Sequence, residues 1–170
     1  MSNEAKKQLT EEERLRNDKR RASADRLEAE GDAFIQEEKL EEAADRWFRC
    51  WELRTYLMSS DPKNESWDDF IRISLKYGDV RRELGQYDSV EVAGARILYI
   101  AVRSFEKDSP EFIAAAALCT ERFGLAKRLK GQAEDAVMEY ESAAWNYGRA
   151  GNAEKSDECL AIAAELRQSL

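Results

Sequence analysis

"YGDVRRELGQYDSVEVAG" (residues 77–94) and "FGLAKRLKGQAEDAVMEY" (residues 123–140) each contain two glycines seven residues apart, within sequence that otherwise has helical spacing. A small residue in one helix lets a second helix approach closely. A glycine in the following turn can adopt the left-handed backbone conformation that ends the first helix. The spacing therefore predicts helix–turn–helix hairpins rather than phosphate-binding loops.

The same pattern occurs once more in full and once in half. In the earlier copy Gly31 matches the first glycine and Glu38 occupies the turn, so the turn positions 38, 85 and 131 are 47 and 46 residues apart. A half copy begins at Gly151, near the end of the chain. Repeated helical hairpins predict a stack in which each hairpin covers the next.

The composition favours an all-α protein. The chain has 170 residues, of which 43% are hydrophobic and 36% charged, with only two prolines and no strand-like alternation. We predict about seven antiparallel helices in one domain, residues 1–170. Its parts are a charged N-terminal helical extension (1–22), three hairpins (about 23–58, 65–106 and 110–149) and a C-terminal capping helix (about 152–168). A plain antiparallel bundle is the alternative fold.

Several classes of function are disfavoured. Histidine is absent and no nucleophile elbow, P-loop or dinucleotide fingerprint occurs, so we expect no enzyme, no catalytic residue, no metal and no cofactor. The net charge of −8 argues against nucleic-acid binding, and no apolar run is long enough for membrane insertion. The odd number of cysteines and the lack of a secretory leader predict reduced thiols in a cytoplasmic protein.

The hairpin residues resemble those of the tetratricopeptide repeat (TPR) family. The family pattern places a small residue in the first helix, Gly-x-Tyr at the turn, and Ala, an aromatic residue and Ala in the second. "GDAFIQEEKLEEAADRWFRC" (31–50) and "FGLAKRLKGQAEDAVMEYESA" (123–143) match it, within a resemblance that covers about residues 24–166. Gly94 stands where an aromatic residue belongs, and the long period is similar to that of long-helix relatives such as SNAP-type trafficking adaptors.

The resemblance implies a partner-binding groove lined by the first helix of each hairpin. Its predicted residues are Asp25, Glu28 and Asp32; Arg72, Leu75, Asp79 and Arg82; and Glu121, Leu125 and Arg128. The groove would be acidic at one end and basic at the other; alternatively, these are merely solvated charges. The family's carboxylate clamp needs Lys and Asn at several of these positions, and their absence disfavours a co-chaperone of that kind.

We therefore expect a non-enzymatic protein-interaction module, an adaptor or chaperone-like protein, that binds a peptide or protein segment. The alternative is a structural protein that self-assembles into a homo-oligomer, which exposed Trp51, Tyr56 or Trp145 would favour. A small-molecule sensor with a cavity ringed by Tyr77, Arg96 and Tyr99 is a third possibility. Trp47 and Trp51 are expected in the core rather than as partner anchors. Trp145 and Tyr147 are expected either in the core or in a half-exposed surface patch.

Overall fold

The computed structural model describes residues 9–170, which form seven α-helices and no strand. The all-α prediction is confirmed. The helices are α1 (Glu11–Gln36), α2 (Leu40–Ser60), α3 (Trp67–Glu83), α4 (Tyr87–Ser104), α5 (Pro110–Leu129), α6 (Ala133–Arg149) and α7 (Ala153–Gln168).

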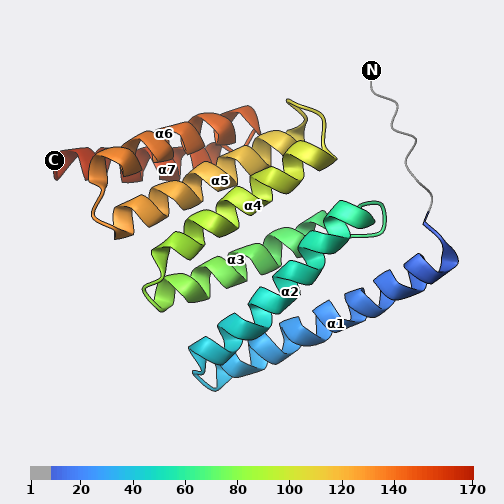
Figure 1. Ribbon diagram of the computed structural model, residues 1–170. Coiled ribbons are helices and arrows are strands. Elements are labelled where there is room, and N and C mark those ends of the chain that lie inside the picture. The colour runs from blue at the N-terminus through green and yellow to red at the C-terminus, as the bar shows by residue number, and fades with distance from the viewer. Residues whose placement is uncertain (1–8) are drawn as a thin grey trace.

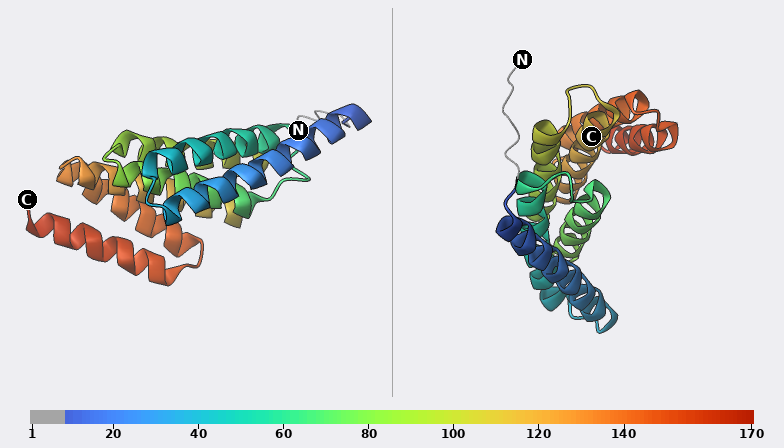
Figure 2. Two further views of the ribbon diagram at one scale, coloured as in Figure 1. Left: turned by 90° about the horizontal axis from the view of Figure 1, so that it is seen from below. Right: turned by 90° about the vertical axis from the view of Figure 1, so that its right-hand side faces the viewer.

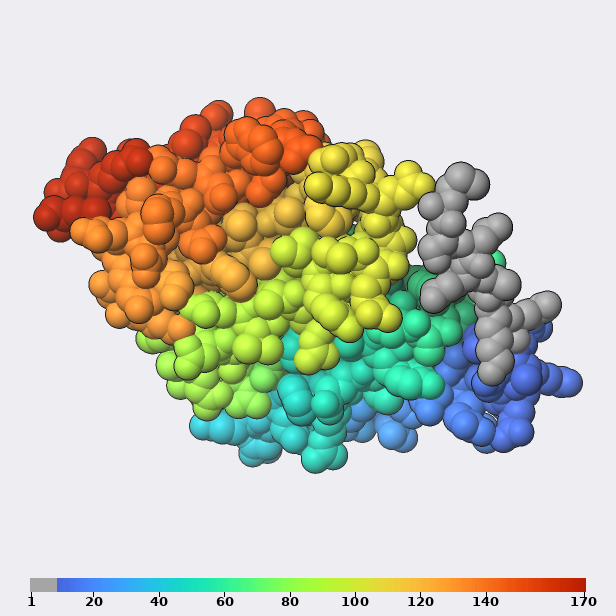
Figure 3. Space-filling model, turned by 45° about the horizontal axis from the view of Figure 1, so that its top comes forward, coloured from blue at the N-terminus to red at the C-terminus, as the bar shows by residue number. Residues whose placement is uncertain are grey.

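The helices are stacked in chain order. Each helix packs against the next one along the chain, and the two views of Figure 2 agree with Figure 1 in showing a series from α1 to α7. The space-filling view in Figure 3 shows the same order as successive bands of colour. The hairpins α1–α2, α3–α4 and α5–α6 follow one another in this way, and α7 lies against α6.

The turns of the hairpins share one geometry. Glu38, Gly85, Gly131 and Gly151 have positive φ angles of 59°, 73°, 75° and 77°. After each of them, the next amide donates to the carbonyl oxygen five residues earlier, at 2.8–2.9 Å. This is the hydrogen bond of a left-handed helix cap. The predicted turns are confirmed, including the half copy and the turn in which Glu38 replaces glycine.

Glycines in the first helices provide room for aromatic rings of the second. A Cβ added at Gly31 would lie 2.4 Å from two atoms of the Trp47 indole, and one at Gly124 would lie 3.0 Å from the Tyr140 ring. Gly94, which departs from the family pattern, has a different role. A Cβ there would lie 3.0 Å from Cβ of Arg122 and 3.3 Å from a backbone oxygen of α5, so this glycine lets α4 approach α5.

The N-terminal part of α1 begins with a capping box. Thr10 Oγ1 accepts from the Glu13 amide at 3.2 Å, and the Glu13 carboxylate accepts from the Thr10 amide at 2.8 Å. Most side chains of residues 11–22 are exposed, with two notable exceptions. Asn17 is buried, and Arg21 is paired with Asp61 beyond the end of α2. Residues 1–8 of the predicted extension lie outside the described residues.

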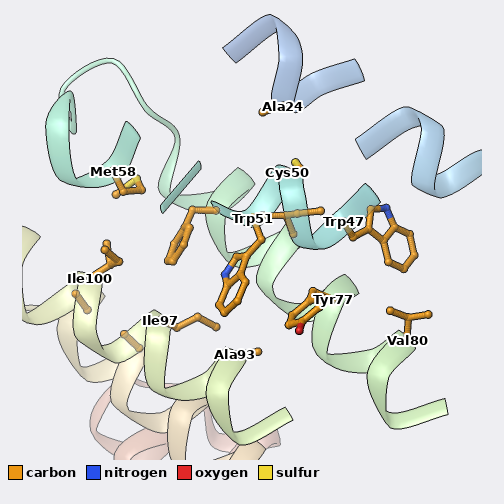
Figure 4. Packing of buried hydrophobic residues seen from close by; sticks show 14 of the residues in the cluster. Ala24, Trp47, Cys50, Trp51, Met58, Tyr77, Val80, Ala93, Ile97 and Ile100 are labelled. Carbon is orange, nitrogen blue, oxygen red and sulfur yellow. The ribbon is translucent and has the colours of Figure 1, made fainter. Parts of the chain in front are cut away.

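The core has two parts. One cluster, around Trp51, joins α1 through α4 and includes Ala115 of α5. The other, around Tyr140, joins α5, α6 and α7. In Figure 4 the Trp51 indole lies near Tyr77 and Ile97, whereas Cys50 points toward α1. All three cysteines are buried and free, as expected.

Candidate functional site: charged surfaces between the hairpins

The predicted groove residues of α1 and α3 meet in a cluster of ion pairs. Arg72 donates to both carboxylate oxygens of Glu28, through Nε at 2.8 Å and through Nη2 at 3.0 Å. Lys76 Nζ donates to Glu28 at 3.0 Å and to Asp32 at 2.6 Å. These contacts connect the first hairpin to the second through side chains of their first helices.

Glu28 is the most strongly perturbed acid of this cluster. Burial by itself would raise the pKa of its carboxyl group, but hydrogen bonds from Arg72 and Lys76 outweigh burial and lower the pKa to about 2. Glu28 is therefore held as a carboxylate, since two cations compensate its loss of hydration.

The predicted residues of α3 connect in the same way to α5. Arg122 Nη1 donates to Asp79 at 2.6 Å, and Arg82 lies 3.7 Å from the same carboxylate oxygen. Arg82 is 38% exposed at its side chain, so its charge remains available to solvent. Leu75 is half-buried against the first core cluster.

The two joints use equivalent positions of the repeat. Asp32 and Asp79 each follow the first glycine of their hairpin by one residue, and Lys76 and Arg122 each precede the first glycine of the next hairpin by two. The pairs Asp32–Lys76 and Asp79–Arg122 are thus the same contact made twice. In the third hairpin the acidic position is occupied by Leu125, and the next helix along the chain is α7.

Lys76 and Arg122 were not among the predicted site residues, although their repeat positions could have identified them. The prediction selected the side of each first helix that bears Asp79 and its equivalents. Lys76 and Arg122, which pair with these acids, lie at a different position of the repeat. Only a comparison of the charges at each position across the three hairpins would have identified them.

The third hairpin holds its predicted acid by other contacts. Glu121 accepts from the Tyr147 hydroxyl at 2.5 Å and lies 3.5 Å from Lys155 Nζ on α7. Burial and this hydrogen bond raise the pKa of Tyr147, so its hydroxyl stays protonated. Leu125 is half-buried, whereas Arg128 is exposed and forms no ion pair within residues 9–170.

Asp25 is exposed, but it is paired with a buried arginine in a network that the sequence did not predict. Arg54, only 4% exposed, donates to Asp25 and to Glu65, both at 2.6 Å. Glu65 is almost fully buried and also lies 3.4 Å from Arg21. The network attaches α1 and α2 to the loop before α3. Two carboxylates pair with the Arg54 guanidinium and so compensate the loss of its hydration.

Of the three residues that we expected to ring a small-molecule cavity, two pack against Trp51 and the third is exposed. Tyr77 stacks on Trp51 with ring centroids 5.0 Å apart, and the Arg96 guanidinium lies 4.5 Å from the centre of the same indole. Trp51 Nε1 donates to Ser74 Oγ at 2.9 Å. Tyr99 is exposed on α4 and lies beside Arg103. Tyr77 and Arg96 thus pack directly against Trp51, while Tyr99 points to solvent.

Large apolar side chains are exposed at equivalent positions of two hairpins. Val92 and Tyr99 on α4 correspond, counted from the turn, to Met138 and Trp145 on α6. All four are at least half exposed, and Trp145 reaches 64%. Trp47 and Trp51 are buried, as expected, and so is Tyr147, which therefore does not share the surface position of Trp145.

The three cysteine thiols are shielded from solvent. Burial raises the pKa of Cys50 to about 12 and those of Cys119 and Cys159 to about 11, which keeps the thiols protonated at neutral pH. Within residues 9–170 no three acidic or thiol side chains are grouped as metal ligands, and none of the helices is long and apolar enough to cross a bilayer.

The fold defines a class, a stack of antiparallel helical hairpins joined by buried apolar contacts and by ion pairs. Comparison with known proteins does not assign the chain to a narrower class. The chain matches no model of a known protein family and none of the curated proteins with which it was compared.

Proposed function

We propose that this chain is a non-enzymatic protein-interaction module, an adaptor or chaperone-like protein of TPR-like type. It binds a peptide or protein segment over the surface of α1, α3 and α5. The observation that carries the proposal is the pair of equivalent ion pairs between these first helices, Asp32–Lys76 and Asp79–Arg122. They hold charged side chains in fixed positions while leaving several of them partly exposed.

Fixed charges suit selection of a partner. Asp32 and Arg72 are about half exposed at their side chains, and Arg82 and Arg128 extend the charged surface toward the ends of α3 and α5. Charges that are already positioned need little reordering when a partner binds. Such charges contribute to encounter rate and specificity more than to affinity.

Site-specific photo-crosslinking tests this proposal. The photo-reactive amino acid p-benzoylphenylalanine is introduced at position 82, on the proposed binding surface, or at position 49, an exposed arginine on α2 that serves as a matched control. The proposal expects a discrete cross-linked partner from position 82 that is absent from position 49. The same adducts from both positions, or adducts from position 49 alone, would contradict it.

A specific observation also favours the second candidate, a self-assembling structural protein. Val92, Ala95, Tyr99 and Val102 are all exposed and lie three and four residues apart along one side of α4. This is the spacing of an apolar stripe that packs against another helix. Tyr56 and Trp145 are exposed as well, whereas Trp51 is buried and does not support this candidate.

Sedimentation velocity over a series of concentrations distinguishes the two candidates. A self-assembling protein should form larger species as its concentration rises, and Tyr99→Glu should abolish them. If the protein is a monomer at every concentration, the self-assembling candidate is wrong and the interaction module remains.

A further inference from the structure

A shallow groove of about 510 Å³ lies between α6 and α7, apart from the surface of the proposed function. Its walls are formed by Glu141, Ala144, Trp145, Gly148, Arg149, Ser156 and Leu160. Trp145 and Leu160 are 64% and 49% exposed, so two large apolar side chains face solvent across this groove. Exposed tryptophans at the edge of a depression are common anchors for protein partners.

The two charged residues in the walls already have partners. Glu141 is paired with Arg167 at 2.5 Å, and Arg149 is paired with Asp108 at 2.7 Å while its guanidinium lies 4.7 Å from the centre of the Trp145 ring. The remaining wall side chains are apolar or small. The groove thus offers an apolar contact surface without an unpaired charge in its walls.

The two helices that form the groove are strongly acidic. Residues 133–170 contain eight acidic and three basic side chains, a net charge of −5. Each of the three bases, Arg149, Lys155 and Arg167, is already paired with an acid. Five exposed acids of α6 and α7 form no ion pair within residues 9–170: Glu134, Asp135, Glu154, Asp157 and Glu165.

We propose that the α6–α7 groove docks a cationic amphipathic helix of a partner protein. Apolar side chains of this helix contact Trp145 and Leu160, and its Lys and Arg side chains lie near free acids of α6 and α7, above all Glu154 and Asp157 of α7. A helix fits better than an extended strand, because helices that satisfy their own backbone hydrogen bonds offer no edge for strand addition. A depression between two packed helices accommodates the ridge of a third. A second copy of this acidic chain would meet like charges here.

The test uses two model peptides with the same leucine positions and opposite charge. One is an amphipathic Leu/Lys helix, and the other has Glu in place of each Lys. The expected result is that the Leu/Lys peptide binds the full chain, detected by calorimetry and by a shift of the Trp145 indole NH signal. The buried Trp47 and Trp51 signals should stay in place. Equal binding of the Leu/Glu peptide would overturn the charge part of the proposal.

Matched variants locate the site. Trp145→Ala should weaken binding about tenfold, a change of about 1.4 kcal/mol, whereas Tyr99→Ala, the equivalent position on α4, should leave it unchanged. Glu154→Gln with Asp157→Asn should weaken binding more than Glu41→Gln with Glu42→Gln, an exposed acidic pair on α2. Circular dichroism checks that each variant folds. Unchanged affinity in the folded Trp145→Ala variant would overturn the proposal.

Two further outcomes separate this inference from its alternatives. If the wild type self-associates in sedimentation and Trp145→Ala does not, the occupant is a second copy and the partner-helix proposal is wrong. Arg82→Glu with Arg128→Glu should leave peptide binding intact, since both arginines belong to the surface of the proposed function. The experiments therefore distinguish failure of the proposed function from failure of the groove proposal.

Discussion

Replacing Gly31 with alanine tests how the first hairpin is packed. The new Cβ would lie 2.4 Å from Cδ1 and Nε1 of Trp47, and this ring is buried and donates from Nε1 to the Glu28 carbonyl oxygen at 3.3 Å. The indole cannot swing away without losing that contact. Overpacking of this kind costs up to about 3 kcal/mol, and the better helix propensity of alanine returns about 1 kcal/mol. We expect a net loss of about 2 kcal/mol.

Gly148→Ala is the matched control. Gly148 is also helical, but its added Cβ would find only Ser156 Oγ, at 3.8 Å. This variant should be as stable as the wild type or gain up to about 1 kcal/mol. Thermal unfolding should place the midpoint of Gly31→Ala about 4–8 °C below that of the wild type. A Gly31→Ala protein no less stable than Gly148→Ala would refute the packing argument.

Three further substitutions test the charged contacts. Glu28→Gln should lower the free energy of unfolding by about 1–2 kcal/mol at neutral pH. Because the pKa of Glu28 is depressed to about 2, this difference is present above about pH 4.5 and disappears as the pH falls toward 2. Urea unfolding at several pH values measures it. Arg54→Leu leaves the buried Glu65 carboxylate with only its 3.4 Å contact to Arg21 and should cost about 3 kcal/mol. The double variant with Glu65→Leu should recover part of this in the same assay, and no recovery would contradict the pairing. A double-mutant cycle on Asp79 and Arg122 should give a coupling of about 0.5–1 kcal/mol, and zero coupling would remove this pair from the account.

The turns and the close approaches of helices could be predicted from the sequence because both depend on local requirements. A left-handed cap needs a residue that tolerates positive φ, and glycine meets this need at three of the four turns. The helix next to an aromatic ring needs a residue without a side chain, as at Gly31 and Gly124. The sequence did not reveal why position 94 is a glycine, because this depends on how α5 crosses α4.

The buried Arg54 network could not be predicted in the same way. Asp25, Arg54 and Glu65 have no regular spacing, and they meet only because the loop before α3 folds back onto α1 and α2. By sequence alone, Arg54 is one of many charged residues on a helix. Its burial follows from the three-dimensional course of that loop.

The predicted groove residues were selected from a family resemblance, and the structure adds how they are held. Most of the charged ones pair with the next first helix or with α7, so they are neither simply solvated nor fully free. Arg82, whose contacts with Asp79 and Glu83 are long at 3.7 and 4.0 Å, and Arg128, which forms no ion pair within residues 9–170, are the least tightly paired cations of this surface. They are therefore better probes of binding than Arg72, whose loss would also leave Glu28 with one cation fewer.

Affinity capture from a native lysate, read by mass spectrometry, tests the proposed function most directly. The baits are the wild type, Arg82→Glu with Arg128→Glu, and Arg49→Glu as an exposed control on α2. We expect a partner that the wild type and Arg49→Glu retain and the double variant loses, while circular dichroism shows all three equally folded. A partner retained by all three baits would contradict binding through the surface of α1, α3 and α5.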